Sequence, residues 1–212
     1  MKRLLLLVIM VVELLAGDKP TESEFDGIIE RAPTPELKAG AICEKVSNYE
    51  RKSANPQLCI DAAKKMEKAQ FNDLWFDIAE AQFLIENRSF KWISKEDTRK
   101  KVKNYFLQIE KPSLIENSYF NAALMYYARG SRKRAFELFQ KAYNIMIKLP
   151  SRYQNPSLYN ILGAYYQYGW GGITKNKIKA YKLFRKAAKM GYSLAEENLD
   201  RLCTDSPWAC KE

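Results

Sequence analysis

Residues 135–142, AFELFQKA, and residues 180–187, AYKLFRKA, are two versions of one eight-residue stretch at an offset of 45. In both, apolar residues recur at spacings of three and four, which is the period of an amphipathic helix. The preceding stretches also match, because residues 126–127 and 165–166 are both Tyr-Tyr, at an offset of 39. Repetition of a two-helix unit of about 40 residues predicts an all-α superhelical solenoid of antiparallel hairpins, each stacked on the next.

Four segments can be distinguished along the chain. Residues 1–18 have the pattern of a removable leader. Residues 19–35 contain three prolines and little apolar periodicity, which predicts a linker. Over 36–110 the helical period continues, and we expect generic N-terminal helical hairpins. Residues 111–212 contain the repeats, and we expect them to end in a C-terminal cap closed by cysteines.

The leader has the layout of a bacterial secretory signal peptide. Residues 1–17, MKRLLLLVIMVVELLAG, begin with two basic residues, continue with an apolar run and end with small residues. The run is shorter than the roughly 20 residues that a membrane-spanning helix needs. Residues 14–17 look like a lipobox, but Asp18 stands where the lipidated Cys belongs. We expect export to the periplasm, with lipid anchoring only if the native precursor carries that Cys.

The chain contains four Cys and no His. Without imidazole there is no Ser-His or Cys-His nucleophile pair and no His-ligated zinc. Four cysteines allow three pairings. Pairing Cys43 with Cys59 and Cys203 with Cys210 closes short loops, and we favour these disulfides for an exported protein. The alternative is a Cys₄ zinc site, which lacks the paired C-x₂₋₄-C spacing.

The composition argues for a binding protein rather than an enzyme. The chain has 35 Lys and Arg against 25 Asp and Glu, a net charge of +10, which suggests an acidic partner or an anionic surface. Export makes nucleic acid improbable. Asp77, Glu80 and Glu86 have near-helical spacing, but solvated helix faces contain such carboxylates routinely. The glycines at 169–172 lack the Lys-Ser/Thr of a phosphate loop. We expect no catalytic residue, metal or cofactor.

The second copy of the repeat resembles the Sel1-like repeat, a relative of the tetratricopeptide repeat, and residues 118–147 resemble a shorter, tetratricopeptide-like form. The loop Gly169-Trp170-Gly171-Gly172 is one residue longer than the usual Gly-x-Gly, and Asn176 stands where Asp is common. The positions that carry the resemblance are Leu162, Gly163, Tyr166, Gly169, Gly172, Ile173, Lys179, Ala180, Phe184, Lys186, Ala187, Ala188, Gly191, Ala195 and Leu199.

The resemblance implies that the array binds a protein segment on a concave surface lined by the first helix of each repeat. Tyr, Trp and Arg are enriched at interface hot spots. The alternative for each aromatic residue is a place in the core between hairpins. The protein-binding candidates that the repeat pattern does not itself require are Tyr126, Arg129, Tyr165, Tyr168 and Trp170.

The C-terminal residues 202–212 resemble the cysteine-closed tails of exported bacterial Sel1-like proteins. We interpret them as a cap, in which a last helix over 193–203 and Trp208 cover the end of the apolar stack.

Three classes of function are consistent with these features. Small exported Sel1-like proteins resemble immunity proteins that neutralise type VI secretion effectors, notably phospholipases, and a basic solenoid would capture an acidic effector surface quickly. The second class is an envelope scaffold or regulatory adaptor. The third is an enzyme acting on cell-wall precursors or β-lactams, which the absence of His and of a Ser-x-x-Lys motif disfavours.

Overall fold

The computed structural model describes residues 21–32, 34–70 and 95–211, so the predicted leader and Asp77, Glu80 and Glu86 lie outside the described part. The described part is an all-α solenoid, as the repeat predicts. Its helices are α2 (Glu22–Arg31), α3 (Pro35–Tyr49), α4 (Gln57–Lys68), α6 (Lys95–Tyr105), α7 (Lys111–Ala128), α8 (Arg132–Met146), α9 (Pro156–Tyr168), α10 (Lys177–Lys189) and α11 (Ser193–Asp205), with short turns η1 (Phe106–Glu110), η2 (Ser151–Tyr153), η3 (Trp170–Gly172) and η4 (Pro207–Cys210).

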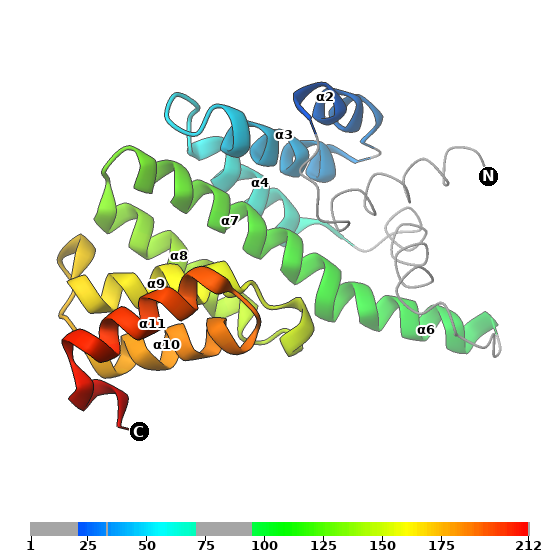
Figure 1. The fold of residues 1–212 in the computed structure, drawn as a ribbon. Coiled ribbons are helices and arrows are strands. Elements are labelled where there is room, and N and C mark those ends of the chain that lie inside the picture. The colour runs from blue at the N-terminus through cyan, green and yellow to red at the C-terminus, as the bar shows by residue number, and fades with distance from the viewer. Residues whose placement is uncertain (1–20, 33, 71–94, 212) are drawn as a thin grey trace.

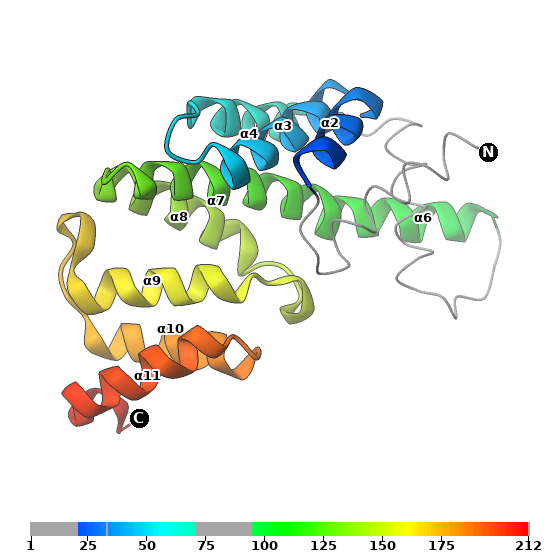
Figure 2. The same cartoon turned by 45° about the horizontal axis from the view of Figure 1, so that its top comes forward.

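The helices stack in chain order from one end of the molecule to the other (Figure 1). Helices α3 and α4 pack on α7, and α7 forms a hairpin with α8. The next hairpin is α9 with α10, and α11 packs on α10 at the C-terminal end. The turned view shows α3–α4, α7–α8 and α9–α11 as successive layers (Figure 2). Each layer therefore buries its apolar side mainly against its neighbours in sequence.

Asparagine caps explain where three of the helices begin. The side chain of Asn55 accepts a hydrogen bond from the amide of Gln57 at 3.0 Å, and Asn155 accepts one from Ser157 at 3.0 Å. Asn176, the departure from the usual Asp, caps α10 in the same way. Asn and Asp are equally good caps, so this substitution leaves the helix start intact.

The linker predicted over 19–35 is wrong for residues 22–31, which form helix α2. Thr21 and Glu24 make a reciprocal capping box at its start, and Phe25 and Ile28, three residues apart, are buried. Lys45 of α3 donates to a carboxylate of α2 at 2.6 Å. The prolines that suggested a linker flank the helix rather than interrupt it, and one of them lies in the first turn of α3, where proline is tolerated.

The boundary predicted between residues 110 and 111 is also absent, because α6, η1 and α7 form one continuous helical rod. Proline inside a helix removes a donor and clashes with the carbonyl four residues earlier. Here the turn before Pro112 is a π-helix, in which the amide of Lys111 bonds to the carbonyl of Phe106, five residues back. This wider turn makes room for Pro112 within the rod.

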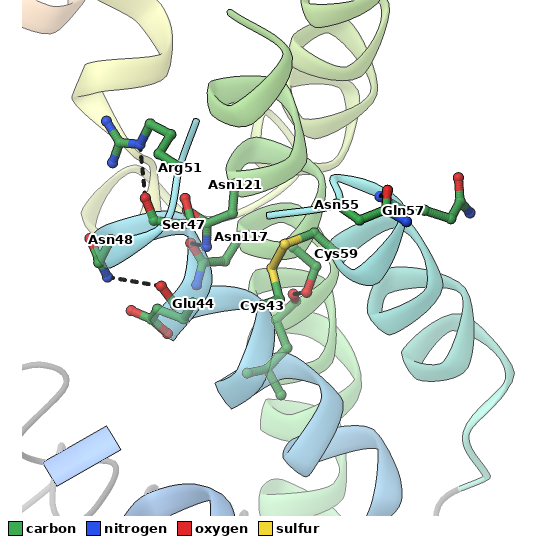
Figure 3. The surroundings of a disulfide bond; sticks show 12 residues. Cys43, Glu44, Ser47, Asn48, Arg51, Asn55, Gln57, Cys59, Asn117 and Asn121 are labelled. Carbon is green, nitrogen blue, oxygen red and sulfur yellow. Dashed lines mark hydrogen bonds between the residues drawn. A yellow bond between two sulfur atoms is a disulfide. The ribbon is translucent and has the colours of Figure 1, made fainter. Parts of the chain in front are cut away.

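Both disulfides are the pairs favoured from the sequence. Cys43 to Cys59 joins α3 to α4, and Cys203 to Cys210 joins α11 to η4. The first lies beside polar side chains of α3 and α7 (Figure 3), where Ser47 donates to Asn121 at 3.1 Å. The N-terminal hairpin is thus held by a covalent bond and by a buried hydrogen bond to α7.

The predicted C-terminal cap is present in α11, but Trp208 does not take part in it. Leu202 of α11 is fully buried in a cluster with Ala180 and Phe184. In contrast, Trp208 is 59% exposed, whereas its neighbour Ala209 is buried. The short loop closed by the second disulfide turns the small side chain inward and the indole outward.

Replacing Cys43 and Cys59 together with Ser should lower the free energy of unfolding by about 3 kcal/mol, because the bridge closes a 16-residue loop. The matched replacement of Cys203 and Cys210 opens a seven-residue loop and should cost about 2 kcal/mol. Urea unfolding of both variants measures the difference. An unchanged midpoint for the first variant would contradict a stabilising role.

Glu116 makes stability depend on pH. Its side chain is 6% exposed, its Oε1 has no hydrogen-bond partner among the residues that the structure describes, and burial raises its pKa from 4.5 to about 8. The folded state therefore keeps a proton that the unfolded state loses, and stability should fall as pH rises, at up to about 1.4 kcal/mol per unit. Glu116→Gln should remove this slope between about pH 5 and about pH 8 and be the more stable protein at the upper end. Thermal melts across pH test this; parallel slopes for both proteins would refute it.

Candidate interaction surface

Tyr165 lies at the centre of the junction between the α7–α8 and α9–α10 hairpins. It is fully buried, and its hydroxyl donates to the carbonyl of Arg132 at 3.1 Å. Burial raises the pKa of this hydroxyl. The expectation that Tyr165 contacts a partner is therefore wrong, because the ring is part of the core. The ring centroids around it belong to Phe136 at 5.3 Å, Trp170 at 5.7 Å, Phe139 at 5.9 Å and Tyr127 at 6.3 Å.

The glycine loop after α9 brings Trp170 against the start of α8. Gly169 ends α9 in the left-handed conformation, with φ of 71°. Gly171 has φ of 73°, and a Cβ there would lie 3.0 Å from the carbonyl oxygen of Arg132. Only glycine combines this backbone conformation with so close an approach. Gly171 thus allows the loop to make close contact with the preceding hairpin.

Four side chains form what we call the arginine–aromatic surface: Tyr127, Arg132, Tyr168 and Trp170. The guanidinium carbon of Arg132 lies 3.6 Å from the ring centroid of Tyr127 and 4.7 Å from that of Trp170. Tyr168, 40% exposed, stacks on Trp170 with centroids 5.1 Å apart. The Nη1 atom of Arg132 is enclosed without a hydrogen-bond partner among the described residues, so the two rings stabilise the cation.

A shallow depression beside this surface is predominantly basic. It is lined by residues 130–134 and Glu137, which include Arg132, Lys133 and Arg134. Glu137 pairs with Arg134 at 2.8 Å, which leaves the charge of the depression positive. The combined region presents exposed aromatic area next to fixed cations, a composition suited to an acidic protein segment.

The two remaining candidates lie apart from this cluster. Arg129 donates through Nε to the carbonyl of Lys52 at 2.8 Å and through Nη2 to the carbonyl of Ala54. It therefore ties the end of α7 to the loop between α3 and α4. Tyr126 is half-buried and lies close to Arg134, at the edge of the depression. The structure thus groups Tyr168 and Trp170 and gives Arg129 a structural contact.

The first helices of the repeats do not form an open concave face in this protein. No residue of α7 is exposed, and Tyr168 is the only exposed residue of α9. Helices α3 and α4 cover α7, while α9 lies between α8 and α10 (Figure 2). A partner therefore has access to the end of α9 and its loop rather than to a groove along the first helices.

Sequence reasoning missed Tyr127 and Arg132. Tyr127 lies beside the chosen Tyr126, and Arg132 belongs to the run Arg132-Lys133-Arg134, which has the pattern of a solvated helix face. The only signal in the sequence is that Gly130 separates them, so a tight turn can fold Arg132 back towards α7. Gly130 does have a left-handed backbone, with φ of 78°, and its amide bonds to the carbonyl of Tyr127. The second ring that stacks on Arg132 belongs to Trp170 in the next repeat, and no local feature of the sequence indicates this contact.

Comparison with known proteins places the surface on recognised repeats. The family model for the Sel1 repeat matches residues 117–144 and 156–192. The chain therefore contains Sel1 repeats, and these generally mediate protein–protein interaction. The two matched segments are the hairpins that meet at Tyr165. No curated protein and no solved structure gives a significant match.

The residues that the structure describes include neither a candidate metal-ion cluster nor a candidate membrane-spanning helix. No group of three or more Cys, Asp and Glu in those residues is arranged to hold a metal ion. No described helix is both long and apolar enough to cross a membrane.

The close approach at Gly171 is testable with its neighbour as a control. Gly172 also has a left-handed backbone, with φ of 80°, but a Cβ at that position would meet nothing within 4 Å. Gly172→Ala should cost about 1–2 kcal/mol for the backbone alone. Gly171→Ala should cost more and reduce the near-ultraviolet circular dichroism of the aromatic cluster. Equal losses in thermal unfolding would show that the contact with α8 is unimportant.

Proposed function

We propose that this protein is a non-enzymatic binding solenoid that captures an acidic protein through the arginine–aromatic surface. The observation that best supports this proposal is the position of Arg132 between the rings of Tyr127 and Trp170, with Tyr168 exposed beside them. Stacked rings hold the guanidinium in one orientation, so little side-chain freedom is lost when a carboxylate binds nearby. The Sel1 repeats that carry these residues support a binding role.

We propose further that the protein acts after export, in the bacterial periplasm. Two disulfides in one small chain are typical of an oxidising compartment, and the leader has the layout of a secretory signal. In that compartment the partner is a type VI secretion effector of the phospholipase class, and the protein is its immunity protein. The resemblance to small exported Sel1-like proteins supports this identity, and the positive charge supports rapid capture of an acidic effector.

Tyr168→Ala should weaken binding to a purified phospholipase effector by about 10- to 30-fold, because the exposed ring is lost while the core is unchanged. Trp208→Ala is the matched control, since Trp208 is an exposed aromatic residue that does not belong to the arginine–aromatic surface. It should leave affinity within about twofold. Calorimetric titration measures both affinities, and inhibition of lipase activity measures the protective effect.

Association should also slow between low and physiological ionic strength, because exposed charges are screened. If the wild-type protein neither binds nor inhibits any phospholipase encoded beside its gene, the immunity assignment is refuted. If it binds but Tyr168→Ala and Trp208→Ala behave alike, the partner is correct and the surface is wrong.

A further inference from the structure

The net charge of the chain comes from one continuous part of the sequence. Residues 138–195 contain ten Lys and Arg and no Asp or Glu, which leaves 25 basic residues against 25 acidic residues elsewhere. Six of the ten lie on α10, and none lies on α9. The +10 of the protein is therefore concentrated on and around the outer helix of the second Sel1 repeat.

Three of the basic side chains of α10 occupy the side of the helix that faces away from the core. Ala180, Leu183, Phe184 and Ala187 are buried, and they fill one side of the helix. The opposite side carries Lys182, Arg185 and Lys189, spaced by three and four residues, and all three are exposed. Lys182 and Lys189 are seven residues apart, which is about 10 Å along the helix, so the three charges lie within about one Debye length of each other along a single face.

The helix beneath α10 brings no negative charge to this face. Helix α9, on which α10 packs, has no Lys, Arg, Asp or Glu. Helix α11 carries Glu196, Glu197 and Asp200, which are exposed on the side opposite its buried Ala195 and Leu202, and Asp205, which is exposed at its C-terminal end. The α10 face is thus a positive stripe of the outer surface.

The type of cation distinguishes this stripe from the arginine–aromatic surface. Residues 129–134 contain three Arg and one Lys, together with exposed aromatic area, whereas α10 carries five Lys and one Arg. Arginine is enriched and lysine depleted at protein interfaces, because the planar guanidinium makes directed hydrogen bonds. Lysine acts as a point charge, and a row of four to eight basic residues on a helix is the pattern that anionic lipid surfaces attract.

The geometry points to a second binding surface: the outward face of α10, with Lys182, Arg185 and Lys189 at its centre, docks on an anionic bilayer. The apolar side of α10 is occupied by the core, so the helix lies against the headgroups and does not insert. Binding is then electrostatic, reversible and sensitive to salt. This inference is independent of the proposed effector, since it uses a different face and a different ligand.

The test is co-sedimentation of the purified full chain with vesicles of phosphatidylcholine, with and without phosphatidylglycerol, at low and physiological ionic strength. Binding should require phosphatidylglycerol and weaken with salt. The variant Lys182→Gln, Arg185→Gln, Lys189→Gln should bind on the order of 100-fold more weakly at low salt. The matched control is Lys64→Gln, Lys65→Gln, Lys68→Gln on α4, which removes the same charge from three exposed positions of another helix and should retain binding.

Thermal melts verify that both variants are folded, because all six side chains are exposed. Absence of wild-type binding to phosphatidylglycerol vesicles at low salt overturns the proposal. Equal weakening by the α4 control also overturns it, since binding would then follow net charge alone. A third outcome is that vesicle binding is absent but sedimentation velocity shows a salt-sensitive dimer that the α10 variant no longer forms. In that case the α10 face binds the acidic face of a second copy of the chain rather than a bilayer.

Discussion

The packing of Tyr165 against the preceding hairpin is the interaction on which the rest of the structure depends. In a solenoid each hairpin packs mainly on its neighbours, so the junction of the α7–α8 hairpin with α9 and its glycine loop joins the N-terminal layers to the C-terminal ones. Phe136 and Phe139 of α8 enclose the Tyr165 ring, and further along the same helices Tyr143 meets Tyr159 edge to face at 5.8 Å. Aromatic pairs contribute about 0.5–1.5 kcal/mol each beyond their buried area, and their geometry orients α9 on α8.

The orientation of α9 on α8 also determines which side chains are exposed to solvent. Because α7 and α9 are enclosed, the side chains of these repeats that a ligand can reach lie at the end of α9 and on the outer side of α10. At the end of α9, the glycine loop places Trp170 over Arg132 and creates an arginine-rich, aromatic region. On α10, Ala180, Phe184 and Ala187 are buried, and Lys182, Arg185 and Lys189 face outward together with the partly exposed Ile178. One surface thus lies at the junction of the two repeats and the other on the outer side of the second, and their side chains differ in chemistry.

Local patterns predicted much of the fold and failed where a contact came from a distant segment. The helical period, the caps at Asn55 and Asn155 and the disulfide pairs could be predicted, because each depends on residues close in sequence. Helix α2 was missed, because Phe25 and Ile28 are its only buried residues. Pro112 suggested a helix end, because spacing alone does not reveal the π-turn that accommodates it. Of the four side chains of the arginine–aromatic surface, Tyr168 and Trp170 were among the candidates chosen from the sequence, whereas Tyr127 and Arg132 were not.

Spacing along the chain was sufficient to determine that this protein is an all-α solenoid containing Sel1-type hairpins, with short disulfide loops and a basic net charge. Tertiary packing decided what the repeated positions do. Tyr126 and Tyr165 correspond in the repeat, yet the first is half-buried at the edge of the basic depression and the second is fully buried. The physical reason is that a repeat position specifies a side chain's direction on its own helix, whereas its burial depends on which hairpin is stacked against that side.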